Sequence, residues 1–259
     1  MLEKVKKYLG SLEKEAIPQL SLNCVIFGFH GKKLKVIVNK IELGAATIFV
    51  LPGGYIGQRE DLTDAVERIV RGSTGLEEIT FRQFEVFGKA SRSFGNELPW
   101  LRRNFAKTDR KALAWVSKRF ISVCYLALVD FNKIDLKPTP FLEAQWLPVD
   151  EASILAMDHA DIVTSAVSSL AKELPYTPIA SKLLPYKFTL PDLQALVEAI
   201  TGKRVDRPNF RRKILSSGLI VKVGKDSSGH RRPADLYRFR HDKKTNPLGL
   251  FNIQDHRTR

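Results

Sequence analysis

Residues 51–78 read LPGGYIGQREDLTDAVERIVRGSTGLEE and contain the strongest local structure signals in this chain of 259 residues. The Gly53-Gly54 pair predicts a turn after a strand, and the acidic residues that follow suit the first turn of a helix. Gly75 is a typical helix stop, because glycine adopts the left-handed conformation of a C-cap at little cost. The stretch therefore predicts a strand, a turn and a helix that ends at Gly75.

The spacing within this stretch resembles the Nudix box, G-x5-E-x7-R-E-U-x-E-E-x-G-U, in which U is a bulky aliphatic residue. The matching positions are Gly54, Glu60, Arg68, Val70, Gly75 and Leu76. Strand-like runs surround the box, and a further helix follows them. The resemblance implies a fold of the α/β class, a Nudix-like α/β/α sandwich.

The three positions at which the Nudix family keeps its catalytic glutamates hold Ile69, Gly72 and Ser73 here. Diphosphate cleavage needs Mg²⁺ bound by carboxylates, and a helix presents several of them to one metal only at spacings such as i, i+3 and i+4. Glu60 remains, but one carboxylate is a poor magnesium site. We therefore expect no catalytic residue, no metal and no cofactor. Without a side chain, Gly72 is expected to bring the helix close to a neighbouring backbone.

The alternative is an active Nudix hydrolase of ADP-ribose or a related nucleoside diphosphate derivative. It requires an unrelated carboxylate, such as Glu85 or Glu97, to replace the missing ligands. Such a replacement is disfavoured because a metal site demands a specific ligand geometry.

A pocket that has lost its glutamates suits the binding of an anionic ligand without cleavage. Arg68 either pairs with Glu60 in a structural role or contacts the ligand. Arg92 either binds a phosphate or sugar hydroxyl or is solvated. The predicted ligand-binding residues are Gly53, Gly54, Glu60, Arg68 and Arg92.

Composition favours a soluble cytoplasmic protein. Hydrophobic residues make up 44% of the chain, yet no apolar run approaches the length of a membrane span, and the N-terminus has no signal-peptide core. Cys24 and Cys124 lie inside apolar strand-like runs and have no partners at zinc-ligand spacing. They are expected to be buried thiols rather than a disulfide or a metal site.

Positive charge is concentrated in the last third of the chain. Residues 175–259 contain 18 Lys and Arg against 7 Asp and Glu, a net charge of +11 out of +14 for the whole chain. Such asymmetry favours a nucleic-acid-binding module attached to a nearly neutral domain. A solvated basic face with no partner is the alternative.

The order of elements in this part is that of a winged helix-turn-helix. Residues 158–174 have a helical apolar stripe, and 176–189 are expected to connect it to a second helix. That helix begins after Thr189 and stops at Gly202, and a basic helix follows between Asp206 and Gly218. Strands at LIVKV and LYRFR then flank a basic turn, which predicts the wing.

A winged helix places its third helix in the major groove and its wing along the DNA backbone. Phe210, Ile214 and Leu215 are expected to form the inner stripe of that helix. Arginine reads guanine and asparagine reads adenine, so the candidates for base contact are Arg207, Asn209 and Arg211. The candidates for phosphate contact are Lys203, Arg204, Arg212 and Lys213, and those of the wing are Lys225, His230, Arg231 and Arg232.

A long basic insertion at 93–118 separates two strand-like runs and contains Trp100, Phe105 and Trp115. It is too long for an ordinary hairpin loop. It would cover a ligand pocket, pair with a second subunit, contact DNA phosphates, or pack on the surface through its tryptophans.

The two halves together resemble the Nudix-related transcriptional regulators. The similarity is carried by the degenerate box, by ISVCYLALV and HADIV, and by YTPIASKLLPYKFTLPDLQALVEAITG, DRPNFRRKILSSGLI and RRPADLYRF. The resemblance implies a homodimer on a palindromic DNA operator, with a small-molecule effector in the Nudix-like domain. One branch of the family responds to ADP-ribose and controls NAD synthesis. Another responds to pentoses and controls sugar use, and the insertion departs from the family's usual short loop.

We accordingly expect a ligand-responsive DNA-binding regulator with three parts. These are an N-terminal helical extension (1–18), a Nudix-like sensing domain (19–155, with the insertion) and a winged helix-turn-helix domain (156–259). An architectural or RNA-binding protein that responds to no small molecule is a further alternative.

Overall fold

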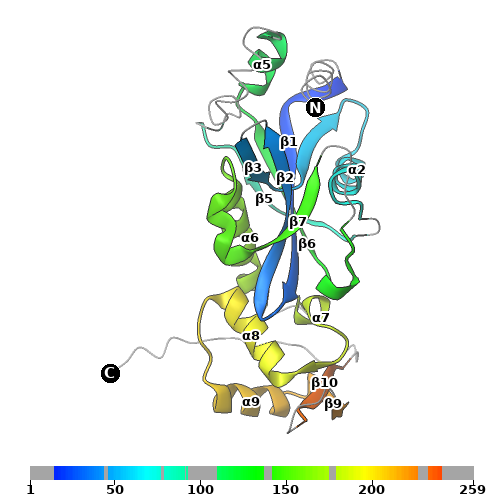
Figure 1. Cartoon of the computed structure of the whole chain (residues 1–259), viewed down its shortest axis with the longest axis vertical. Coiled ribbons are helices and arrows are strands. Elements are labelled where there is room, and N and C mark those ends of the chain that lie inside the picture. The colour runs from blue at the N-terminus through cyan, green and yellow to red at the C-terminus, as the bar shows by residue number, and fades with distance from the viewer. Residues whose placement is uncertain are drawn as a thin grey trace, which may run out of the picture. The chain divides into compact units, whose positions relative to one another are not determined.

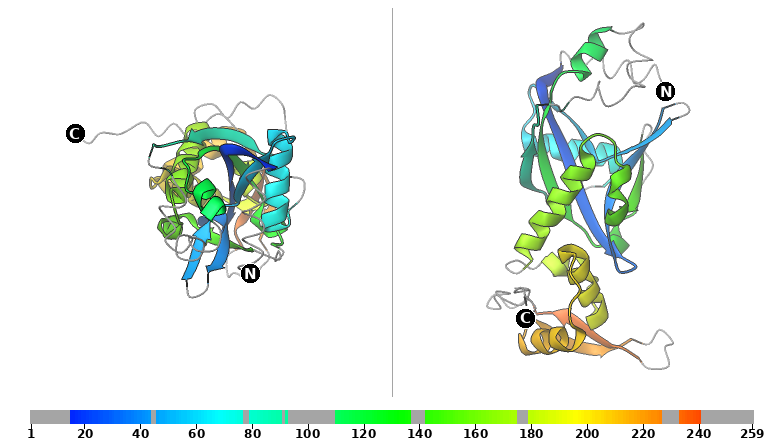
Figure 2. Two further views of the ribbon diagram at one scale, coloured as in Figure 1. Left: turned by 90° about the horizontal axis from the view of Figure 1, so that it is seen from above. Right: turned by 90° about the vertical axis from the view of Figure 1, so that its left-hand side faces the viewer.

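The computed structural model describes residues 15–43, 46–76, 79–90, 92, 110–136, 142–174, 179–226 and 233–240. These residues belong to two compact units (Figures 1 and 2). The first unit draws on the ranges Met1–Phe27, Val36–Ala127 and Ile134–Ala166, and the second on Gly28–Lys35, Leu128–Lys133 and Val167–Arg259.

A seven-stranded β-sheet forms the centre of the first unit. Its path runs β3 (Ala46–Val50), β2 (Lys33–Leu43), β1 (Ala16–His30), β6 (Ile121–Leu128) and β5 (Arg82–Phe87), while β4 (Gly53–Gly57) pairs with β1 and β7 (Glu143–Pro148) pairs with β2. Side chains 21–29 of β1 are all buried, because this strand is central and covered on both faces. That double coverage explains why residues 24–29 are apolar without alternation, while the buried polar Asn23 bonds to Ser122 Oγ at 2.6 Å.

Two helices cover the opposite faces of this sheet (Figure 1). On one face lies α2 (Leu62–Thr74), which buries Ala65, Val66, Ile69 and Val70 and ends at Gly75 with a left-handed φ of 73°. On the other lies α6 (His159–Glu173). The predicted α/β/α sandwich and the helix stop at Gly75 are both confirmed.

The first unit also contains α5 (Arg110–Val116) and η2 (Val149–Ile154), and η1 (Phe131–Lys133) belongs to the second. β1 begins at Ala16, inside the range expected to form the N-terminal extension, and residues 1–14 lie outside the described ranges. Within those ranges, no helix is both long and apolar enough to span a membrane.

The expectation for the cysteines is confirmed. Cys24 and Cys124 are buried free thiols on the neighbouring strands β1 and β6. Burial raises the pKa of Cys124 to about 12 and that of Cys24 beyond the normal thiol range. Both side chains are therefore neutral and act as small core residues.

The second unit contains a winged helix. Its elements are α7 (Ile179–Leu183), β8 (Phe188–Thr189), α8 (Leu190–Thr201), α9 (Arg207–Ser216), β9 (Ile220–Lys225) and β10 (Asp235–Phe239), with strand order β8-β10-β9. Thr189 and Asp192 form a capping box at the start of α8, and Asp206 caps α9 by accepting from the Asn209 N–H at 3.0 Å. These caps and the stop at Gly202 were predicted from sequence and are confirmed.

Two details of this unit differ from expectation. The segment 176–189 is not only a connection, because it contains the short helix α7 with Ile179, Ala180 and Leu183 buried. Phe210 and Ile214 are buried as predicted, but Leu215 is 43% exposed. Leu215 follows Ile214 by one residue, and a helix turns about 100° per residue, so one of the two had to leave the core.

Replacing Gly53 or Gly72 by alanine is expected to change stability in opposite directions. A Cβ at Gly53 would lie 2.5 Å from Asn23 Oδ1 and 2.9 Å from the Leu22 carbonyl oxygen, whereas one at Gly72 would meet no atom within 4 Å. We expect Gly53→Ala to destabilise the protein by about 1–3 kcal/mol through overpacking. Gly72→Ala is expected to stabilise it by about 0.5–1 kcal/mol, because α2 gains a better helix former. Urea denaturation measures both, and destabilisation by Gly72→Ala would contradict the open environment of residue 72.

Candidate functional sites

The loop of the box is held by one carboxylate. Glu60 accepts hydrogen bonds from Arg68 Nε at 2.6 Å, Arg68 Nη2 at 2.7 Å and the Gly57 N–H at 2.9 Å. Arg68 Nη2 also donates to the Tyr55 carbonyl oxygen at 2.8 Å. The hydrogen bond from Arg68 is the main reason that the pKa of Glu60 is below its ordinary value. Of the two roles considered for Arg68, the structure shows the pairing with Glu60.

The three degenerate positions have different surroundings. Ile69 is buried against Gly54, where a Cβ would lie 3.1 Å from Ile69 Cγ1. Ser73 is also buried, and its Oγ donates to the Val70 carbonyl at 3.3 Å. Gly72 is exposed, and among the described residues no neighbouring backbone comes within 4 Å of a Cβ placed there, so the expected close approach is wrong for this part of the chain. The Nudix pattern has glutamates, which are charged, at the positions of Ile69 and Ser73. In this chain both side chains are buried.

Carboxylates elsewhere do not rebuild a metal site in the described part of the chain. No group of three or more His, Cys, Asp or Glu side chains there is arranged to hold a metal ion. Glu85, one of the two possible replacements, hydrogen-bonds to Ser165 of α6. Glu97, the other, lies outside the described residues.

An aromatic cluster connects the insertion to the box. Trp115 of α5 is buried, and its ring centroid lies 4.7 Å from that of Tyr55 and 4.9 Å from that of Phe120, both in edge-on contacts. Tyr55 is the residue whose carbonyl accepts from Arg68. Trp115 thus packs as expected for a surface insertion held by its tryptophans. Residues 93–109 of the insertion, including Trp100 and Phe105, lie outside the described ranges.

Arg92 has a structural role that was not among the two considered. Its side chain is only 5% exposed, its Nε donates to Asp158 Oδ2 at 2.7 Å, and its Nη1 donates to the Phe120 carbonyl at 3.2 Å. The expectation of a solvated arginine is therefore wrong. The sequence showed no sign of this contact, because 66 residues separate the two partners. Ligand binding by Arg92 stays a prediction.

His159, the first residue of α6, was missed by the sequence analysis. It is 2% exposed, and its Nδ1 accepts a hydrogen bond from the Leu51 N–H at 2.9 Å. Burial lowers the pKa of His159 to about 4; the Asp158 charge opposes this shift and the Arg92 charge adds to it. Leu51 lies two residues before β4, which begins at Gly53, so the turn expected at Gly53-Gly54 is wrong and these glycines belong to a strand. The neutral imidazole consequently ties the start of α6 to the box.

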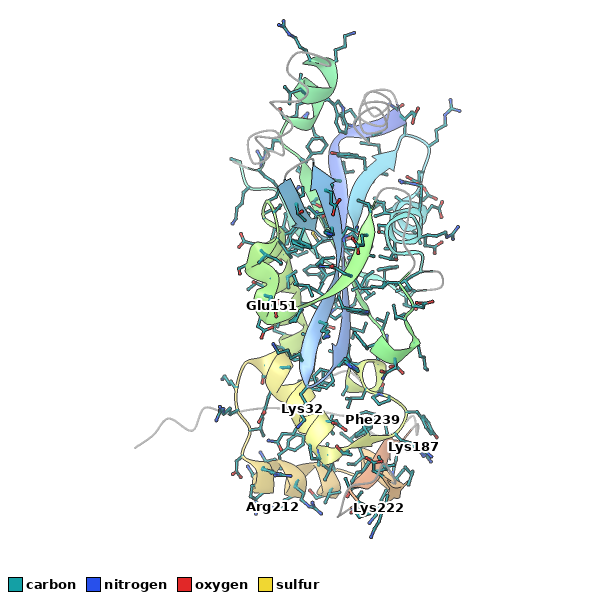
Figure 3. All side chains as sticks on the ribbon, in the orientation of Figure 1. Lys32, Glu151, Lys187, Arg212, Lys222 and Phe239 are labelled. Carbon is teal, nitrogen blue, oxygen red and sulfur yellow. The ribbon has the colours of Figure 1, made fainter. Side chains whose placement is uncertain are left out.

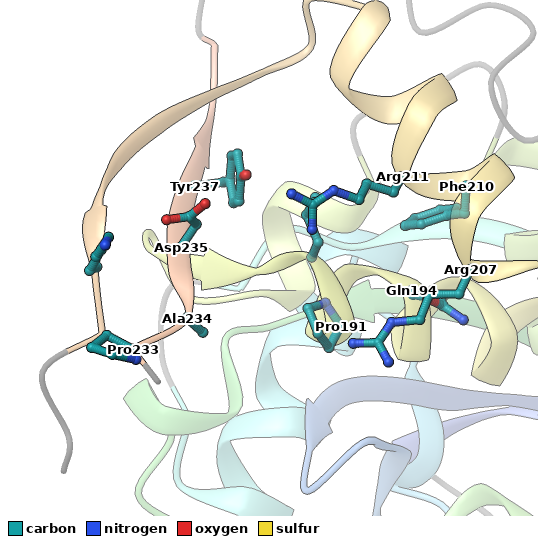
Figure 4. Close-up of a pocket in the computed structure, with 11 residues that line it drawn as sticks. Pro191, Gln194, Arg207, Phe210, Arg211, Pro233, Ala234, Asp235 and Tyr237 are labelled. Atoms are coloured by element: carbon teal, nitrogen blue, oxygen red, sulfur yellow. The ribbon is translucent and has the colours of Figure 1, made fainter. Parts of the chain in front are cut away.

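A second candidate site lies between α9 and the β9–β10 hairpin. A cavity of about 320 Å³ there is lined by three cations, Arg207, Arg211 and Lys225, and by Asp235. Figure 4 shows both arginine side chains extending from α9 toward the strand that carries Asp235 and Tyr237. The remaining lining is mostly apolar, formed by Leu190, Pro191, Gln194, Phe210, Pro233, Ala234 and Tyr237. Cations above an apolar lining are suited to the phosphates and sugars of a nucleic acid.

The other predicted DNA-binding residues lie in α9, in the turn that precedes it, or outside the described chain. Lys203, Arg204, Arg212 and Lys213 are exposed. Arg212 Nη2 donates to Asn209 Oδ1 at 3.0 Å, so Asn209 must release this bond before it can pair with adenine through both its amide atoms. Figure 3 shows Arg212 of α9 and Lys222 of β9 at the same end of the second unit. The wing residues His230, Arg231 and Arg232 lie outside the described ranges.

The buried histidine predicts a pH dependence of stability. Its folded pKa of about 4 lies below the ordinary value of 6.5, so between these pH values the unfolded chain binds more protons than the folded one. Stability contributed by neutral His159 is complete above pH 6.5 and is lost as the pH falls toward 4, by roughly 3 kcal/mol in total. His159→Asn keeps an acceptor for the Leu51 N–H but does not titrate.

Unfolding free energies of wild type and His159→Asn between pH 4 and 7 measure this effect. As the pH falls, the unfolding free energy of the wild type is expected to decrease more than that of His159→Asn. Parallel pH profiles would show that His159 is not buried in its neutral form.

Comparisons with known proteins agree with this architecture. Residues 180–239 match the family described as the NrtR DNA-binding winged helix domain. A relative from Acinetobacter baylyi, described as an ADPR responsive transcriptional repressor NtrR, is 25% identical over 239 residues, covering 90% of this chain and 87% of that protein.

Solved structures are similar over most of the chain. Shewanella oneidensis NrtR in complex with a 27mer DNA has a TM-score of 0.62 and 25% identity, covering 86% of this chain and 94% of that one. A MutT/nudix family protein from Enterococcus faecalis has a TM-score of 0.58 at 17% identity, covering 91% of this chain and 93% of its own, and supports the fold alone. With a degenerate Nudix-like domain followed by this type of winged helix, the chain is similar to the Nudix-related transcriptional regulators of the NrtR type.

Proposed function

We propose that this protein is an effector-responsive transcriptional regulator that binds DNA through its winged helix. Its Nudix-like domain binds a small effector, ADP-ribose or a related nucleotide or sugar, without hydrolysing it. The observation that carries the proposal is the state of the box. Glu60 and Arg68 keep the loop in place, while Ile69 and Ser73 put apolar and neutral core contacts where carboxylates would bind Mg²⁺.

ADP-ribose is favoured over a pentose because the Acinetobacter baylyi relative is described as ADPR responsive and aligns with nearly the whole chain. The proposed effector-binding residues are Gly53, Gly54, Glu60, Arg68 and Arg92, and Arg92 is held in place by Asp158 and the Phe120 carbonyl. Arg68 is half exposed, and two of its donors already bind Glu60, so the loop is ordered before a ligand arrives. A preordered loop reduces the entropy lost on binding.

DNA binding is supported by the winged helix and by the three cations around its cavity. A recognition helix such as α9 enters the major groove and presents side chains to base edges. We propose a homodimer, because a symmetric pair of such helices matches a palindromic operator with half-sites spaced by whole helical turns.

The effector proposal predicts ligand stabilisation without turnover. At 100-fold excess over its Kd, ADP-ribose is expected to stabilise the folded state by about 2.7 kcal/mol and so raise the Tm by roughly 5–10 °C. A thermal-shift series with ADP-ribose, NAD, AMP and arabinose measures this. Chromatography of ADP-ribose incubated with the protein and Mg²⁺ or Mn²⁺ should show no AMP. Release of AMP at ordinary enzymatic turnover would instead establish the hydrolase.

The DNA proposal predicts which side chains contribute to specific binding. Arg207→Ala and Arg211→Ala are each expected to weaken binding to the gene's own upstream fragment by about 1–3 kcal/mol. Lys213→Ala should lower the slope of log affinity against log salt by about 0.9, the loss of one phosphate contact. Arg71→Ala, an exposed arginine of α2, is the matched control and should change neither quantity. No binding to any upstream fragment at low salt would refute the proposal.

A further inference from the structure

A single acidic side chain lines the basic cavity of the winged helix. Asp235 is the first residue of β10, and it faces a space that Arg207, Arg211 and Lys225 also line (Figure 4). Its Oδ1 lies 2.6 Å from Lys222 Nζ on the paired strand β9. A carboxylate in this place opposes the phosphates that the surrounding cations would attract.

Three other acidic side chains of the second unit accept hydrogen bonds from backbone N–H groups, whereas the bond found for Asp235 comes from a lysine side chain. The N–H groups of Thr189, Val205 and Asn209 donate to the carboxylates of Asp192, Glu198 and Asp206, at 3.0, 2.9 and 3.0 Å. These three bonds secure the ends of α8 and α9 and the turn between them. Asp235 instead bonds to a lysine side chain. Helix capping therefore does not account for the presence of a carboxylate at position 235.

The charges around Asp235 indicate what it does. The hydrogen bond from Lys222 is the main cause that holds the pKa of Asp235 below its ordinary value, and the charges of Lys225 and Arg211 act in the same direction. The carboxylate is thus ionised at neutral pH. It pairs Lys222, which is half exposed and would otherwise contact a phosphate. It also reduces the net positive potential of the cavity.

We propose that Asp235 restrains the winged helix from binding DNA phosphates irrespective of sequence, and so makes binding depend on the base contacts of α9. This inference rests on the proposed DNA-binding function. Binding to phosphates supplies most of the affinity for random DNA, whereas base contacts supply discrimination. Asp235 bonds to Lys222 rather than to the arginines of α9, so it lowers the first contribution and leaves Arg207 and Arg211 available for the second.

The test is the salt dependence of binding to a short duplex of random sequence, measured by fluorescence anisotropy with the full-length protein. Asp235→Asn keeps the shape of the side chain and releases Lys222. We expect it to bind random DNA about two- to fivefold more tightly, the range of a surface ion pair. The salt slope should become steeper by about 0.9, because one more lysine contacts a phosphate. The ratio of affinities for the upstream fragment and random DNA should fall.

Two further variants identify the cause. Adding Lys222→Gln to Asp235→Asn should return both the affinity and the slope to those of wild type. Lys222→Gln alone leaves the carboxylate without its lysine and should weaken binding to random DNA. Glu67→Gln makes the same change of charge on an exposed position of α2 and should have no effect. The Tm of each variant shows whether it is folded.

Two outcomes would overturn the inference. One is unchanged or weaker binding of random DNA by folded Asp235→Asn. The other, which applies even if Asp235→Asn does not fold, is unchanged or tighter binding by Lys222→Gln. Wild-type binding to the upstream fragment together with either result would refute this inference alone. Failure of the wild type to bind any duplex at low salt would refute the proposed function, and this inference with it.

Discussion

The bidentate pair between Arg68 and Glu60 is the interaction on which the Nudix-like site depends. Its two bonds of 2.6 and 2.7 Å join α2 to the loop that precedes it, and further bonds to Gly57 and Tyr55 fix the path of that loop. Paired groups of fixed, planar geometry order a loop more strongly than single contacts do. The chain therefore keeps the shape of the box although the carboxylates on the next turns of α2 are gone.

The box keeps its fold although three of its side chains differ from those of the Nudix pattern. Ile69 packs on Gly54, and Ser73 bonds within its own helix, so both positions contribute to stability. Carboxylates there would have to be bound by a metal or remain buried without compensation. Trp115 packs on Tyr55 of the box, which places part of the insertion beside the same loop.

Two buried contacts hold the start of α6 against the first unit. The neutral imidazole of His159 accepts from the Leu51 N–H, and Asp158 pairs with Arg92. α6 continues from there into the second unit, because its residues up to Ala166 belong to the first unit and those from Val167 to the second.

Local features of this protein were decided by the sequence itself. The caps at Thr189 and Asp206, the stop at Gly75, the loss of the glutamates and the basic character of α9 follow from nearby residues, and short-range geometry suffices to predict them. Only the tertiary structure decided that Arg92 is buried beside Asp158, that His159 binds Leu51 and that Asp235 faces a basic cavity. These pairings join segments that are distant in the chain or depend on strand register, so nearby residues do not reveal them.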